Sequence, residues 1–299
     1  MITCSKRDFI KTAAALAAPF WIGGCAFRKK KLSLLFFTDI HALPSEEVRA
    51  KLSSFHGLIH RLRPEMILGG GDFVHNGLRQ TPAQSAPSWA VYRDFHLSVG
   101  KEIHAACGNH DLVGTRPDDG TPPEADPRKV FCDFFNLDKT WRSFDALGKK
   151  FIFLDASQIV HGEVGQPIYR GRVEEDQMDW LRSELSATPF GKPIILLTHI
   201  PLITSFGTAT LGAHEKLPPG LAIENNMEVL ALFEKHNLAS VLQGHLRVNE
   251  QIVWRNTLFV TGGAVCGKWW KGNLWGTPPG LGTLSFDGDR PEWRYAVPQ

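Results

Sequence analysis

The sequence predicts a layered α/β domain. Two observations lead to this fold class: apolar, β-rich runs recur along the chain, and stretches with helical spacing lie between several of them. The runs at 34–37 and 194–197 are continuously apolar, which is typical of strands covered on both faces. A chain of 299 residues suits one large α/β domain, or at most two small ones.

The expected helices and strands follow in chain order. A helix is expected at Ser45–Arg63, with Ser45 as its N-cap and acidic residues in its first turn. Apolar residues recur at helical spacing in Glu174–Leu185, and a third helix is expected at Asn226–His236. The expected strands are Leu32–Thr38, Met66–Leu68, Glu102–Ala106, Lys150–Leu154, Pro193–Thr198, Ala239–Leu242, Gln251–Val253, Thr257–Val260 and Thr283–Phe286.

The N-terminus has the features of an export signal. Residues 5–11 read Ser-Lys-Arg-Asp-Phe-Ile-Lys and are similar to the twin-arginine motif, with Lys6 in place of its first arginine. The apolar stretch 13–22 that follows is too short to span a bilayer. Small residues then precede Cys25, as in a lipoprotein-processing site.

These features set the expected organisation of the chain. We expect an export signal at 1–24, a tether at 25–32 and the α/β domain at 33–299. The protein would be exported, and either periplasmic or anchored to the membrane through a lipid on Cys25. The alternative is an amphipathic or buried helix at the N-terminus.

Charge and cysteine content argue against several classes of protein. The formal net charge is +2, and removal of 1–24 would leave equal numbers of acidic and basic residues, so no specific nucleic-acid binding is expected. The five cysteines include no Cys-x-x-Cys pair, which argues against a zinc ribbon or a thioredoxin-like motif. The sequence allows one disulfide among Cys107, Cys132 and Cys266 and does not determine the oligomeric state.

Asp, Asn or His side chains follow five of the expected strands. Because ligands bind at the carboxyl ends of strands in α/β sheets, these residues are expected to converge on one crevice. Oxygen and imidazole donors without thiolates suit Mn, Fe, Zn, Co or Ni. A single histidine is more often a solvated or hydrogen-bonded residue, but the ordered set favours a metal site. The set consists of Asp39, His41, Asp72, Asn109, His110, Asp111, His199 and His245.

This ordered set resembles the calcineurin-like metallophosphoesterase superfamily, over about residues 33–260. The resemblance implies a four-layer α/β/β/α sandwich that binds one or two divalent or trivalent metal ions. The blocks that carry it are Asp39-Ile40-His41, Gly71-Asp72, Gly108-Asn109-His110-Asp111, Thr198-His199 and Gly244-His245-Leu246-Arg247.

The resemblance also implies a role for each residue. Asp72 would bridge two metals, and His110 would stay unligated near the ester, oriented by Asp111. The implied ligands are Asp39 and His41 for the first metal, and Asn109, His199 and His245 for the second.

These residue types suit the hydrolysis of a phosphate ester by a metal-activated hydroxide. Two cations roughly 3.5–4 Å apart neutralise the phosphate and generate hydroxide at neutral pH. Asn109 offers a neutral oxygen, which leaves the cations their positive charge. His110 can donate a proton or a hydrogen bond to the leaving oxygen; otherwise it is a structural histidine.

The last block departs from the family pattern, which reads Gly-His-x-His. Arg247 stands at the position of the second histidine, and a protonated guanidinium has no lone pair for a metal. The first metal could therefore be held weakly, or His75 or His214 could supply the missing ligand. Alternatively, the site binds one metal and Arg247 grips a phosphate oxygen in a catalytic role. Arg247 could also point into solvent.

Three segments are candidate walls for a substrate. A Gly-rich stretch at 261–267 is followed by three indoles, which could stack on a base or sugar, or simply pack against the sheet. The segments Leu112–Lys129 and Ser205–Ala222 are long and rich in Pro and Gly, as in many lids and substrate walls. The indoles belong to Trp269, Trp270 and Trp275.

The sequence therefore predicts a hydrolase acting on a small phosphate ester, with a phosphodiester favoured over a monoester. One alternative is a monoesterase similar to purple acid phosphatases, which carry a metal-binding tyrosine three residues after the Gly-Asp aspartate. His75 stands there instead. The other alternative is a degenerate, non-catalytic binding scaffold, suggested by Arg247.

Overall fold

The computed structural model describes residues 32–160 and 168–298, within one compact unit at Lys31–Gln299. The predicted export signal at 1–24 and its Cys25 lie outside the described residues. Across the described ranges, no helix is long and apolar enough to cross a membrane. The helices are α1 (Glu46–Leu62), α2 (Pro82–Val99), α3 (Lys129–Phe135), α4 (Glu175–Ser186), α5 (Phe206–Thr210) and α6 (Asn226–Leu232).

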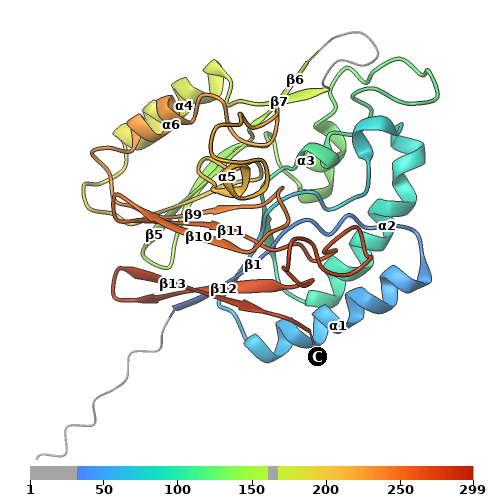
Figure 1. Cartoon of the computed structure of the whole chain (residues 1–299), viewed down its shortest axis with the longest axis horizontal. Coiled ribbons are helices and arrows are strands. Elements are labelled where there is room, and N and C mark those ends of the chain that lie inside the picture. Colours follow the sequence, from blue (N-terminus) through green and yellow to red (C-terminus); the bar gives the residue numbers. More distant parts are fainter. Residues whose placement is uncertain (1–31, 161–167, 299) are drawn as a thin grey trace, which may run out of the picture. The chain divides into compact units, whose positions relative to one another are not determined.

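Two large sheets and one small ribbon contain the strands (Figure 1). The first sheet has the order β13-β12-β1-β2-β3, and the second has the order β10-β11-β9-β8-β5-β4. In both sheets, the strands that precede the predicted ligands run parallel to one another. Antiparallel strands close both edges of the second sheet, but only the β12–β13 edge of the first, whose other edge is the parallel strand β3. The strands are β1 (Leu32–Phe37), β2 (Met66–Gly69), β3 (Ile103–Ala105), β4 (Arg142–Ala146), β5 (Lys149–Leu154), β6 (Ser157–Ile159), β7 (Tyr169–Gly171), β8 (Ile194–Thr198), β9 (Leu238–Gln243), β10 (Glu250–Trp254), β11 (Thr257–Thr261), β12 (Leu281–Asp287) and β13 (Arg290–Ala296).

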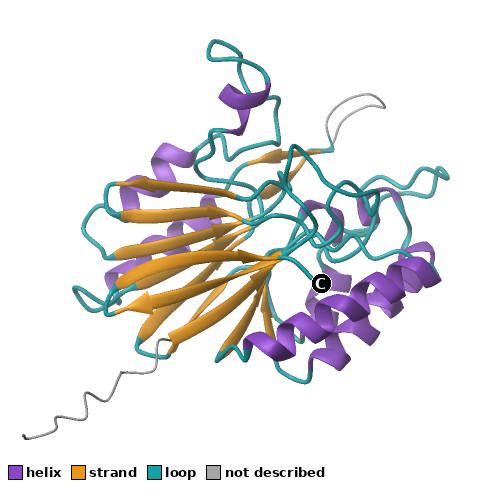
Figure 2. Cartoon of the chain, turned by 60° about the horizontal axis from the view of Figure 1, so that its bottom comes forward, coloured by secondary structure: helices purple, strands orange, loops and turns teal. Residues whose placement is uncertain are grey.

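The two sheets pack face to face between two layers of helices. Phe36 of β1 shares one buried cluster with Phe153 of β5 and Leu197 of β8, which places this core between the sheets. A second cluster joins the outer face of the first sheet to α1 and α2, and a third joins the other sheet to α4 and α6. Figure 2 shows the helices on the two sides of the strands, with loops gathered at one end. The predicted α/β/β/α sandwich is confirmed.

Helix α2 was not predicted, because prolines at both Pro82 and Pro87 weaken its helical pattern. Pro82 occupies the first turn, where the missing N–H has no helical partner in any case. Thr81 and Gln84 form a capping box that starts the helix, so only Pro87 removes a hydrogen bond.

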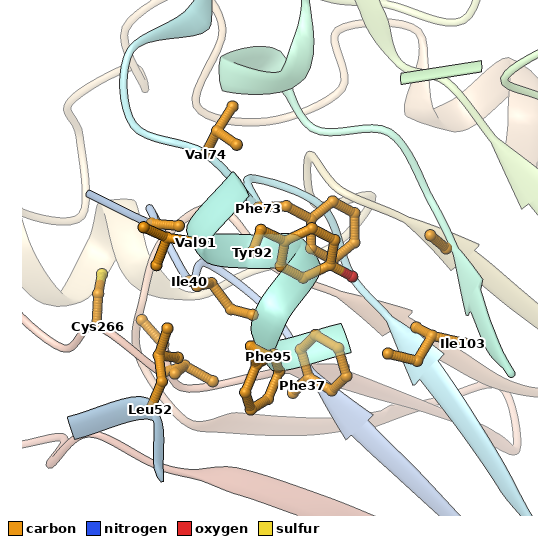
Figure 3. Close-up of a cluster of buried hydrophobic side chains, with 14 of the residues drawn as sticks. Phe37, Ile40, Leu52, Phe73, Val74, Val91, Tyr92, Phe95, Ile103 and Cys266 are labelled. Atoms are coloured by element: carbon orange, nitrogen blue, oxygen red, sulfur yellow. The ribbon is translucent and has the colours of Figure 1, made fainter. Parts of the chain in front are cut away.

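Packing of aromatic side chains compensates for that lost bond. Tyr92 stacks on Phe73 with ring centroids 4.6 Å apart, and Phe95 meets Phe37 edge to face at 5.9 Å. Figure 3 shows these rings between α2 and the first sheet. Burial of one such ring contributes roughly 2 kcal/mol, which exceeds the cost of one missing bond.

Several expected elements differ in extent. Every predicted strand is present, whereas β4, β6, β7, β13 and α3 were not predicted. The helix expected at Asn226–His236 ends at Leu232, because the chain must turn before β9 begins at Leu238. The segment 205–222 contains the short helix α5. The cysteines at 107, 132 and 266 are free.

The segment 112–128 is fixed at both of its ends. Gly114 N–H donates to Gly77 O (3.0 Å) near its start. Arg128 Nε lies 2.6 Å from Asp155 Oδ2 at its end, and the Asp155 side chain is 1% exposed. Because breaking a buried ion pair leaves an uncompensated charge, this contact ties the segment firmly to the residues after β5. The segment is therefore better described as a wall than as a lid.

Candidate metal centre

The predicted ligands lie on tight turns just after the parallel strands. Asp39, His41, Asp72 and His245 have φ angles of 54°, 46°, 55° and 72°, all in the left-handed region. For a residue with a Cβ atom, this backbone conformation is less stable than the right-handed one by about 1 kcal/mol or more. The turns after β1 and β2 are held to each other, since Asp39 N–H donates to Gly71 O at 3.0 Å. Four strained residues at one place mark a site that the surrounding fold holds in shape.

Asp72 lies at the middle of the cluster. Its Oδ2 is 3.4 Å from His41 Nε2 and 3.1 Å from His199 Nε2. Its Oδ1 accepts a hydrogen bond from the backbone N–H of His110 at 2.8 Å. His245 joins the same group, with its Nδ1 3.2 Å from His199 Nε2. Two sets of candidate ligands therefore share the Asp72 carboxylate: His41, Asp72 and His110, and Asp72, His199 and His245.

Outer contacts orient these side chains. Thr38 Oγ1 donates to Asp39 Oδ2 at 2.7 Å, and the backbone N–H of His245 donates to the same oxygen at 2.9 Å. His199 Nδ1 lies 2.7 Å from Gly70 O, so Nδ1 carries a proton and Nε2 faces Asp72. Histidines that ligate metals usually make such a contact to a backbone carbonyl.

The donor atoms fit a metal because they are buried and lack other partners. Asp39 Oδ1, His41 Nε2, Asn109 Oδ1 and His245 Nε2 are buried without a hydrogen-bond partner among the described residues. Buried polar atoms normally have partners, and an orphaned set of oxygen and imidazole donors matches the ligands of a divalent cation. The chain can thus hold metal between Asp72 and these side chains.

Charges within the cluster are coupled. Burial opposes ionisation of Asp72, but the neighbouring positive charge of His199 holds the pKa of this carboxyl well below its usual value. Burial likewise disfavours a charged His199, yet the Asp72 carboxylate raises the His199 pKa to about 9. Burial and the charge on His199 lower the pKa of His245 to about 4. A bound cation would replace the proton on His199 as the counter-charge of Asp72.

His110 is placed as a hydrogen-bond donor rather than as a ligand. Its Nδ1 accepts the backbone N–H of Asn76 at 3.1 Å, and burial lowers its pKa to about 3. A neutral ring that accepts at Nδ1 carries its proton on Nε2, which then has no lone pair for a metal. Its ring centroid lies 4.7 Å from that of His41, so the ring borders the metal cluster.

Asp111 has a different role from the expected one. Its carboxylate accepts backbone N–H groups of Asp72 (2.9 Å), Phe73 (2.8 Å) and Gly108 (2.9 Å). The prediction that it orients His110 directly is therefore corrected, because the Asn76 N–H holds that ring. Burial and the charge of Asp72 raise the Asp111 pKa to about 7. Asp111 instead fixes the backbone turn that carries Asp72.

Arg247 points into the centre and not into solvent. Its Cζ lies 3.8 Å from the ring centroid of Trp269, and its Nε and Nη1 are buried without partners in the described part of the chain. Its φ is 58° and that of Trp269 is 51°, which adds two more strained residues. The Trp269 centroid lies 4.3 Å from that of His41.

The remaining candidate residues divide between the centre and the surface. His75 lies 5.1 Å from Trp269 by ring centroids, but His214 is exposed on the segment 205–222 and belongs to neither candidate ligand set. Trp270 is buried with its Nε1–H on His41 O (3.0 Å), and Trp275 is 66% exposed. Of the three indoles, Trp269 is the one whose ring borders the ligand histidines.

Tyr169 of β7 was missed by the sequence analysis. Its ring centroid lies 6.3 Å from that of His245, and burial raises its pKa. No motif or spacing marks this residue, because it lies on β7, a strand that the sequence did not predict and that pairs with β6. Asn76, which holds His110, was missed for a similar reason: its contribution is a backbone N–H.

Comparison with known proteins decides the family. The sequence profile of the calcineurin-like phosphoesterases matches residues 32–248. The chain belongs to the calcineurin-like phosphoesterase family. Membership makes this protein a metal-dependent hydrolase of phosphate esters, as the ordered blocks predicted. No curated protein matches the sequence.

Solved structures show the same fold at low sequence identity. A dimetal phosphatase from Danio rerio superposes with a TM-score of 0.65 at 11% identity, covering 89% of this phosphoesterase and 96% of that chain. A purple acid phosphatase from yellow lupin (Lupinus luteus) seeds superposes with a TM-score of 0.58 at 14% sequence identity, covering 89% of this phosphoesterase and 51% of that chain. A putative 5'-nucleotidase from Staphylococcus aureus superposes with a TM-score of 0.53 at 12% sequence identity, covering 90% of this phosphoesterase and 54% of that chain. This phosphoesterase thus spans about half the length of the latter two chains.

Proposed function

We propose that this phosphoesterase hydrolyses a small phosphodiester, with a monoester as the second choice. One observation carries the proposal: metal donors around Asp72 and the guanidinium of Arg247, which stacks on Trp269 next to His41, both lack partners among the described residues. The donors attract a cation and the guanidinium attracts an anion, so together they suit a phosphate held on a metal. Mn, Fe, Zn, Co and Ni all fit this donor set.

The ligands divide around Asp72. Asn109, His199 and His245 would hold one cation together with Asp72, while Asp39 and His41 would face a second position. When bound, such cations neutralise phosphate charge and lower the pKa of water enough for attack at neutral pH. Asn109 contributes a neutral oxygen and so leaves that positive charge undiminished.

His110 and Arg247 would act on the substrate directly. The Nε2–H of His110 donates to the leaving oxygen, because Nδ1 is already occupied by Asn76. The Nε and Nη1 of Arg247 donate to a phosphate oxygen, which supplies their missing partners. The Trp269 ring lies beside both Arg247 and His41, where it would also meet an aromatic leaving group.

Charge supports the preference for a diester. A diester phosphate carries one negative charge and a monoester carries up to two. A centre with a full set of donors on only one side of Asp72 would hold fewer cations, and so offer less positive charge, than a centre with two complete cation sites. A centre with less positive charge suits the singly charged diester better than the doubly charged monoester.

The preference is tested by comparing bis-(p-nitrophenyl) phosphate with p-nitrophenyl phosphate in the presence of Mn. We expect kcat/KM for the diester to exceed that for the monoester by about tenfold, corresponding to roughly 1.4 kcal/mol of transition-state stabilisation. Equal rates, or faster monoester turnover, would reverse the order of the two choices.

We also propose that the protein is exported and is periplasmic or anchored through a lipid on Cys25. The twin-arginine-like stretch at 5–11 and the small residues before Cys25 support this location. Nucleotides, phospholipid head groups and phosphorylated glycans then become more suitable substrates than cytosolic cyclic nucleotides. Cell fractionation tests the location, and a chain found with intact N-terminus in the cytosol would contradict it.

A further inference from the structure

The side of the centre next to His41 already contains a fixed positive charge. Arg247 lies on the face of Trp269 with its Cζ 3.8 Å from the ring centroid, and the same indole lies 4.3 Å from His41 by ring centroids. An indole face attracts a cation and orients a planar guanidinium, which stays protonated at any physiological pH. A metal at Asp39 and His41 would therefore have a guanidinium as its neighbour.

The two sides of Asp72 also differ in their donors. On one side, His199 Nε2 lies 3.1 Å from Asp72 Oδ2, and His245 Nδ1 lies 3.2 Å from that nitrogen. The family pattern adds Asn109 to this side, and its Oδ1 is buried with no partner among the described residues. On the other side, the candidate set includes His110, whose proton sits on Nε2 because Asn76 occupies Nδ1.

Without His110, the second set retains His41 and the shared Asp72 carboxylate, to which Asp39 adds an oxygen 3.5 Å from His41 Nε2. Fewer donors and a neighbouring positive charge both weaken cation binding there.

We propose that Arg247, held in place by Trp269, supplies the positive charge of the first cation, so that the enzyme keeps a single tightly bound metal ion. That ion lies on Asp72, Asn109 and the two histidines at 199 and 245. The guanidinium binds a phosphate oxygen through Nε and Nη1, and Trp269 is a positioning residue. This inference rests on the proposed function of the same site.

Metal content tests the first half of the inference without measuring activity. Purified protein is loaded with Mn, dialysed and analysed for metal per chain. We expect one ion in the wild type, one in Arg247→Lys, which keeps the charge, and two in Arg247→His, which removes the charge and adds a donor. Two ions in the dialysed wild type, or one in Arg247→His, would overturn the inference.

Phosphate binding tests the second half. Calorimetric titration of the Mn-loaded protein with inorganic phosphate gives the Kd for the anion. We expect Trp269→Leu to raise this Kd about tenfold, because the guanidinium loses the indole face that orients it. Trp269→Phe should recover much of the affinity, since a phenyl ring still presents a face to the cation.

Trp275→Leu is the matched control, because this exposed indole lies in the same segment. It should bind phosphate like the wild type. A Kd for Trp269→Leu that equals that of the control would show that Trp269 does not position Arg247.

The outcomes separate this inference from the proposed function. A wild type that turns over diester while retaining two ions contradicts the single-ion inference and leaves the proposed function standing. A protein that retains one ion but hydrolyses no phosphate ester with any of the candidate cations contradicts the proposed function, whatever its phosphate affinity.

Discussion

Replacing Asp72 with alanine should abolish phosphoester hydrolysis, with kcat falling by at least about 10³-fold. The Asp72 carboxylate is shared by both candidate ligand sets, and one of its oxygens faces His41 and His199 at 3.4 Å and 3.1 Å. Without it, neither side of the cluster retains a complete set of donors. The metal content of the purified variant should fall together with its turnover of bis-(p-nitrophenyl) phosphate.

Folding of the variant must be checked separately, because Asp72 is buried. Asp72→Asn keeps the side-chain volume but offers a neutral oxygen, and it should lose metal and activity while retaining a cooperative thermal transition. Asp94→Ala removes an exposed carboxylate on α2 and should behave as wild type. Turnover of Asp72→Ala within a factor of two of wild type would rule out the assigned centre.

His110→Gln should lower kcat by about 10²- to 10⁴-fold while leaving metal content unchanged. The Asn76 N–H holds the ring at Nδ1, so in the proposed mechanism Nε2–H would reach the leaving oxygen and the ring would take no part in holding the cation. The loss should be greater for an alkyl ester than for a p-nitrophenyl ester, because a poor leaving group needs the proton more. Comparing the two substrates separates proton donation from a general structural role.

His60→Gln is the control for this substitution, since His60 is exposed on α1 and belongs to neither candidate ligand set. It should leave both rates unchanged. Loss of bound metal in His110→Gln would instead identify His110 as a ligand, and equal losses for the two esters would indicate a structural role.

Much of the fold was predictable because buried parallel strands leave a strong pattern. Apolar runs such as the one in β8 can hardly belong to an exposed element, and each ends in a polar residue where the strand leaves the sheet. The resemblance to the family then added the four layers, which hydrophobic periodicity alone does not give. Helix α2 was missed because Pro87 breaks the local pattern, while the packing that overrides it, Tyr92 against Phe73, is visible only in three dimensions.

The centre was predictable to the extent that its groups are side chains following strands. Arg247 was recognised as a departure from the family pattern, but its stacking on Trp269 could not be foreseen, because 21 residues and β10 and β11 lie between them. Contacts made by backbone groups leave no sequence signal either. The N–H groups that hold His110 and Asp111 belong to residues whose side chains play no part in those bonds.

The account depends most on the claim that hydrolysis requires metal held at the Asp72 cluster. The direct measurement is turnover of bis-(p-nitrophenyl) phosphate by the wild-type protein before chelation, after chelation and after Mn is restored, with metal per chain determined at each step. We predict that activity and bound metal disappear together on chelation and return together with Mn. Hydrolysis that persists in the metal-free protein would contradict the account.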